Sequence, residues 1–99
     1  MDPECIQLCD ALNSMPCVKT FESCCGHGMH SFRIWFVVDV LDELRPLLDE
    51  TTDDPQWMVS VRIASGTNTI IFCLEGPTDV FSGDRLAAQF EKRLFVKKF

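Results

Sequence analysis

The stretch that decides the fold is residues 57–74, WMVSVRIASGTNTIIFCL. Every second residue of its first half belongs to one hydrophobic set: Trp57, Val59, Val61 and Ile63. A period of two is typical of a β-strand whose two faces differ. Gly66-Thr67-Asn68 predicts a tight turn, after which residues 69–74 return as a second strand. The sequence therefore predicts a β-hairpin in this stretch.

Two further strands and a helix are expected before the hairpin. Pro3 and Glu4 are residue types that begin helices, and the hydrophobic positions that follow have helical spacing: Cys5, Leu8, Cys9 and Leu12. Residues 18–22 and 32–38 are rich in the branched and aromatic side chains of strands. The first half therefore predicts one helix followed by two strands.

Two more helices complete the pattern. Residues 39–50 predict a helix, and Pro46 within it should produce a kink or a late start, because proline lacks the N–H group that a helix interior needs. After Gly76-Pro77 breaks the hairpin's second strand, a last helix is expected to begin between residues 78 and 84. The predicted order is α-β-β-α-β-β-α.

This order favours a layered fold. Helices with one hydrophobic stripe each and a four-stranded sheet are most simply accommodated in two layers, with the helices against one face. The helix between the second and third strands predicts a right-handed crossover, which makes those two strands parallel. We therefore predict an α/β (α+β) two-layer sandwich with a mixed sheet, formed by one domain over residues 1–99.

The composition indicates a globular cytoplasmic protein. The chain is 46% hydrophobic with eight Phe, which is enough to form a core. Its longest hydrophobic run, residues 34–38, is too short to cross a bilayer, and its N-terminus lacks the features of a signal peptide. In the cytoplasm its six cysteines would stay reduced. The net charge of −6 repels phosphate backbones, which argues against nucleic acid as a partner.

The most reactive stretch is residues 22–30, ESCCGHGMH, between the first two predicted strands. Thiolate and imidazole are the ligands that zinc prefers in proteins. Cys24, His27 and His30 recur at intervals of three residues, with glycines between them that let the backbone curl. We therefore predict that this loop binds zinc or a similar transition metal through these three side chains.

Other interpretations of the same loop remain open. Cys24 or Cys25 beside a histidine has the residue types of a thiol nucleophile, although nothing in the sequence locates the remaining catalytic groups. The backbone N–H groups of residues 25–28 would suit an anion. The loop is also a plain tight turn if Gly26 or Gly28 has a positive φ. Whether the protein is an enzyme stays undecided.

The predicted outer face of the sheet, away from the helices, suggests two uses. Alternation places Arg33, Trp35 and Arg62 there. Together with Ser23 of the loop, these side chains are expected to bind a small molecule or an anionic ligand. Aromatic residues, Met and Arg are also enriched at protein interfaces. The alternative is a protein–protein interaction module without catalysis, most simply a two-fold homodimer formed through this face or through a sheet edge.

A family resemblance rests on three segments of the first half of the chain. Residues 12–18, 22–28 and 32–36, LNSMPCV, ESCCGHG and FRIWF, resemble a family of short, uncharacterised bacterial and phage proteins with a Ser-Cys-x-Gly-His turn. More distantly, a strand leading into Ser-Cys-x-Gly is similar to the tRNA wybutosine-synthesis methyltransferase family, whose motif has Arg where this chain has His27. That similarity implies binding of S-adenosylmethionine and tRNA, so a nucleotide- or RNA-modifying enzyme is a third expectation.

Overall fold

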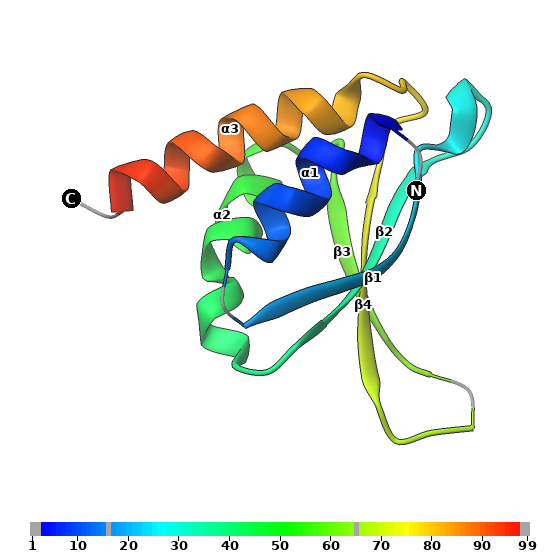
Figure 1. Cartoon of the computed structure of the whole chain (residues 1–99), viewed down its shortest axis with the longest axis vertical. Coiled ribbons are helices and arrows are strands. Elements are labelled where there is room, and N and C mark those ends of the chain that lie inside the picture. Colours follow the sequence, from blue (N-terminus) through cyan, green and yellow to red (C-terminus); the bar gives the residue numbers. More distant parts are fainter. Residues whose placement is uncertain (1–2, 16, 65, 98–99) are drawn as a thin grey trace.

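Helices cover one face of a four-stranded sheet in this computed structural model (Figure 1). The structure describes residues 3–15, 17–64 and 66–97, with side chains described through residue 92. The elements along the chain are α1 (Pro3–Asn13), β1 (Val18–Cys24), the 3₁₀ turn η1 (Gly26–Gly28), β2 (Phe32–Val38), the 3₁₀ turn η2 (Leu41–Leu44), α2 (Arg45–Asp53), β3 (Met58–Ile63), β4 (Ile70–Gly76) and α3 (Ser82–Lys97). The predicted two-layer sandwich and its order of elements are confirmed. No helix in the described part of the chain is long and apolar enough to span a membrane.

The strand order corrects one detail of the predicted sheet. The strands lie in the order β1-β2-β4-β3, and every neighbouring pair is antiparallel. β2 and β3 do run in the same direction, as the crossover predicts, but β4 lies between them. The sheet is therefore antiparallel rather than mixed, because a crossover decides the relative direction of two strands and leaves their adjacency open.

The hydrophobic core lies between the helices and the inner face of the sheet. Phe32, Ile34 and Phe36 of β2 are fully buried on that face, as their alternation predicts. Two ring pairs hold neighbouring segments together. Phe36 stacks on Phe72 of β4 with ring centroids 5.6 Å apart, and Phe32 meets the edge of Trp57 at 5.5 Å. Such pairs contribute about 0.5–1.5 kcal/mol beyond the area that they bury.

The helix that contains Pro46 begins late, as predicted. The chain first forms the 3₁₀ turn η2, and the α-helix α2 starts at Arg45, so that the proline falls in its first turn. A first-turn residue has no hydrogen-bond partner for its N–H within the helix, so proline loses nothing there. Leu44 and Leu47 then point into the core and are fully buried.

Candidate functional site

The loop between β1 and β2 is a tight turn with a left-handed backbone. Gly26 and Gly28 both have a φ of 78°, which confirms the prediction made for these glycines, and His27 between them has a φ of 52°. The N–H groups of Met29 and His30 both donate to the carbonyl oxygen of Gly26, at 2.9 and 3.0 Å. A Cβ atom added at Gly26 would lie 3.0 Å from the backbone oxygen of Ser31. The turn therefore requires glycine at this position for its backbone as well as for space.

The turn places Cys25, rather than Cys24, beside a histidine. The Sγ atom of Cys25 accepts a hydrogen bond from the backbone N–H of His27 at 3.4 Å and lies 3.7 Å from Nδ1 of the same residue. The Sγ atom of Cys24 accepts from the N–H of Gly26. Both thiols thus support the backbone of the turn. Cys25 is almost fully buried, whereas His27 is exposed, so the contact joins a buried thiol to an exposed imidazole.

The three predicted zinc ligands lie in this turn or next to it. Cys24 is half-buried, and His27 and His30 are exposed. Across residues 3–97, in the positions that the structure describes, no three Cys, His, Asp or Glu side chains come together as a metal site would require. None of the six cysteines, all of which are described, takes part in a disulfide. Zinc binding by Cys24, His27 and His30 stays a prediction.

The four predicted ligand-binding residues are divided between the two faces of the sheet. Arg33, Trp35 and Arg62 occupy the outer face, as predicted. Ser23 is opposite the buried Ile34 in the register and therefore points to the inner face. Nε of Arg33 lies 3.7 Å from the carboxylate of Glu75 on the neighbouring strand. This carboxylate offsets part of the positive charge that we expected to bind an anion.

Between Trp35 and Ser60 on this outer face lies the thiol of Cys73. Burial, followed by the nearby carboxylate of Glu75, raises the pKa of Cys73, while Arg62 and Arg33 act in the opposite direction. The thiol is therefore neutral at neutral pH, and the outer face combines an aromatic ring, a thiol and partly offset charges.

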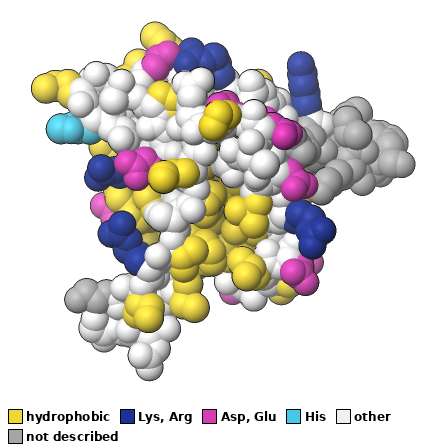
Figure 2. All heavy atoms as spheres, turned by 180° about the vertical axis from the view of Figure 1, so that it is seen from behind, with side chains coloured by type: hydrophobic (Ala, Val, Ile, Leu, Met, Phe, Trp, Pro, Cys, Tyr) yellow, Lys and Arg dark blue, Asp and Glu magenta, His cyan; other side chains and the backbone are white. Residues whose placement is uncertain are grey.

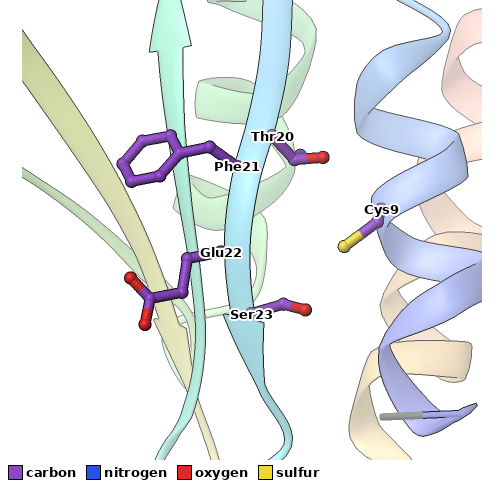
Figure 3. Close-up of a pocket in the computed structure, with 5 residues that line it drawn as sticks. All are labelled: Cys9, Thr20, Phe21, Glu22 and Ser23. Carbon is purple, nitrogen blue, oxygen red and sulfur yellow. The ribbon is translucent and has the colours of Figure 1, made fainter. Parts of the chain in front are cut away.

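Ser23 instead belongs to a pocket between α1 and β1 (Figure 3). Among the residues that the structure describes, those that line a cavity of about 300 Å³ are Cys9, Thr20, Phe21, Glu22 and Ser23. The thiol of Cys9 points from α1 toward β1, the side chains of Thr20 and Ser23 point back toward α1, and those of Phe21 and Glu22 point to the other side of the strand. Three polar side-chain groups from two elements therefore converge on one cavity.

A β-bulge in β1 turns two of the lining side chains toward α1. The register with β2 shifts between Thr20 and Glu22, so that Phe21 is an extra residue and both Thr20 and Ser23 face α1. The side-chain amide of Asn13, at the end of α1, donates to the hydroxyl of Thr20 and accepts from its backbone N–H, both at 2.9 Å. These bonds tie the end of α1 to the bulge.

The chemistry of this pocket is neutral and polar. Burial raises the pKa of Cys9, and hydrogen bonds with the side chains of Ser23 and Thr20 only partly counteract this. The thiol is therefore protonated at neutral pH. From the sequence Cys9 is assigned to core packing, because it shares a hydrophobic helical stripe, and its burial in the core confirms this. Thr20 receives no role from the sequence. The pocket depends on the bulge in β1, and the hydrophobic pattern of residues 18–22 does not predict that bulge.

A further feature is the edge of the sheet formed by β3. The register places Val61, Ile63 and Ile70 on the inner face, where the alternation predicts a buried position. They are nevertheless 59%, 68% and 54% exposed. Figure 2 shows hydrophobic side chains gathered between β3 and α2 on this side of the molecule. We call Val61, Ile63 and Ile70 the β3-edge patch. α1 packs on β1 and α2 contacts β3, but the side chains of Val61, Ile63 and Ile70, near the turn of the hairpin, stay exposed.

Comparison of the chain with protein-family profiles, with curated proteins and with solved structures found no match. The features of the molecule that bear on function are the turn around His27, the outer face of the sheet, the α1–β1 pocket and the β3-edge patch.

Proposed function

We propose that this chain is a protein–protein interaction module that binds another polypeptide along the edge of β3. The observation that carries the proposal is the β3-edge patch, whose side chains face the core side of the sheet and are more than half exposed. Exposed hydrophobic side chains that lie together, next to the edge of a sheet, are typical of interaction sites.

The backbone of β3 supports the same function. β3 is at the end of the strand order and pairs only with β4 among the described strands. Proteins usually protect such edges with proline, lysine, a bulge or a covering segment, because an open edge recruits further strands. The residues of β3, MVSVRI, contain no proline, their register with β4 is regular, and their one charged side chain, Arg62, lies on the outer face. An extended segment of a partner can therefore pair with β3 and cover the β3-edge patch at the same time.

A substitution in the patch tests this function. Val61→Glu places a charge where the partner would bury it, so we expect at least a tenfold loss of partner binding. The tagged chain is used to capture proteins from an extract of its own source. Captured proteins are identified by mass spectrometry, and each interaction is then measured again with purified components. Met29→Glu is the matched control, because Met29 is 79% exposed and lies in the distant β1–β2 loop.

Wild-type protein and the Met29→Glu control should bind the same partner with equal affinity. If Val61→Glu binds every purified partner as tightly as the wild-type protein does, β3 is not the interaction site and the proposal is wrong.

A second candidate function is the binding of a small neutral molecule in the α1–β1 pocket. The observation that favours it is the convergence of the Cys9 thiol with the side chains of Thr20 and Ser23 on a cavity of about 300 Å³, near the lower limit for small-molecule sites. Such groups would hydrogen-bond an uncharged polar ligand.

This second function is tested by a fragment screen monitored by NMR. Neutral polar fragments at about 1 mM, the concentration range for weak ligands, should shift the amide signals of Thr20 and Ser23. Cys9→Met should abolish the shifts, because the longer side chain fills the cavity, whereas Ile6→Met on the exposed side of α1 should preserve them. A screen that leaves both amides unshifted in the wild-type protein would exclude the pocket as a site.

A further inference from the structure

The direction of the backbone groups along β3 can be deduced from one hydrogen bond. The N–H of Ala64 donates to the carbonyl oxygen of Thr69 at 2.9 Å, directly after the pair formed by Ile63 and Ile70. In an antiparallel ladder, successive residues direct both backbone groups alternately to one neighbour and to the other. Ala64, Arg62 and Ser60 therefore bond to β4. The intervening residues Val59, Val61 and Ile63 direct their N–H and C=O groups away from β4, toward the open edge.

The same three residues also direct their side chains to the inner face. A partner strand must therefore have hydrophobic inner-face side chains on the residues whose backbone groups hydrogen-bond to Val59, Val61 and Ile63. β3 itself meets this requirement. When two copies of β3 run antiparallel with Val61 opposite Val61, Val59 of each copy lies opposite Ile63 of the other. All three outward-directed residues then pair, with roughly six hydrogen bonds in total, two for each such pair.

Charge and hydrogen-bond pairing favour this register over the two registers next to it. On the outer face, Val61-centred pairing puts Arg62 of one copy opposite Ser60 of the other. A shift toward the hairpin turn would put the two Arg62 side chains opposite each other, and like charges there are destabilising. A shift in the opposite direction would leave the N–H and C=O groups of Ile63 without hydrogen-bond partners in the other β3 strand. The Val61-centred register avoids both costs.

We propose that the polypeptide bound along β3 is a second copy of this chain, in a two-fold dimer whose β3 strands pair antiparallel about Val61. This inference rests on the proposed function and specifies its partner. The dimer continues the sheet from one copy into the other and brings the two β3-edge patches together on the same face. A two-fold contact needs only one self-complementary surface, and this edge is self-complementary in hydrogen bonds and hydrophobic side chains, with the two Arg62 side chains kept apart.

A charge-swap experiment tests both the partner and the register. Val61→Lys and Val61→Glu each place like charges opposite each other across the two-fold axis, so each variant alone should dimerise at least 100-fold more weakly than the wild-type protein. An equimolar mixture should recover a dimer that contains one chain of each variant, because Lys then faces Glu. Sedimentation of the full chain from ~1 to ~300 μM measures all three samples. Met29→Lys is the matched control and should remain dimeric.

The outcomes separate this inference from the proposed function. A monomeric wild-type protein at ~300 μM overturns the second copy as partner, and the proposed function then stands or falls on the capture experiment alone. Dimers that persist in both Val61 variants also overturn it. If both variants are monomeric and folded, as judged by circular dichroism, but the mixture does not dimerise, the Val61-centred register is wrong.

Hydrogen exchange gives an independent readout of edge pairing. In the wild-type dimer the amides of Val59, Val61 and Ile63 should exchange at least tenfold more slowly than in the monomeric Val61→Lys variant. The amides of Ser60 and Arg62, which bond to β4 in either state, should be protected in both. A dimer in which the first three amides still exchange rapidly would show that the copies associate elsewhere.

Discussion

Replacing Phe32 with alanine should lower the free energy of unfolding by about 3–5 kcal/mol. Phe32 is fully buried, and its ring meets the edge of Trp57 with centroids 5.5 Å apart. On its other side it packs against the backbone of α3, since a Cβ atom at Gly83 would come within 2.6 Å of its ring. Three segments would therefore border the resulting cavity. The free energy is measured by urea denaturation of the wild-type and variant proteins at equal concentration.

The matched control for this substitution is Phe81→Ala. Phe81 is 65% exposed, so the same chemical change there should alter the free energy of unfolding by less than about 0.5 kcal/mol. Equal losses from the two substitutions would contradict the packing that we describe around Phe32.

Replacing Gly76 with alanine should cost about 3 kcal/mol through overpacking. An added Cβ atom would lie 2.4 Å from Cε3 of Trp57, well inside any normal contact. The indole ring is almost fully buried and already packs on Phe32, which is the register partner of Gly76 on β2. The ring therefore cannot move aside without separating the start of β3 from the end of β4. Thermal and urea denaturation both report this loss.

A double-mutant cycle supplies the control for Gly76. In a Trp57→Leu background the smaller side chain leaves room for the new methyl group, so Gly76→Ala should cost at least about 1 kcal/mol less than in the wild-type protein. Strictly additive effects would show that the glycine is needed for a reason other than its contact with the indole ring.

Most of the fold follows from the hydrophobic pattern. Alternation in residues 32–38 and 57–63 assigns the correct face to every side chain that we placed, because the period of a strand leaves only two choices. Pro46 marks the late start of α2 since proline is excluded from a helix interior. The glycines around His27 indicate left-handed backbone, and the structure contains it there. These features depend on local stereochemistry, which short segments encode.

What the pattern does not predict depends on contacts between distant segments. β4 lies between β2 and β3 because of how the hairpin folds back onto the sheet, and no residue spacing records this. Alternation places Val61 on the inner face but does not say whether a helix reaches far enough to cover it. The positions of Cys24 and Cys25 relative to His27 depend on the conformation of one turn. The sequence alone therefore does not predict which of the two thiols lies beside the imidazole of His27.

The two edges of this sheet differ in their capacity for further growth. A dimer joined at β3 leaves a copy of β1 at each end of the joined sheet. A flat, regular strand in that position would recruit more copies, which is the route to fibrils. In β1 the extra residue at Phe21 interrupts the spacing of the hydrogen-bonding groups and bends the strand, and α1 is tied to the bulge through Asn13. The proposed dimer is therefore self-limiting, and raising the concentration of the chain should increase the number of closed pairs without lengthening them into polymers.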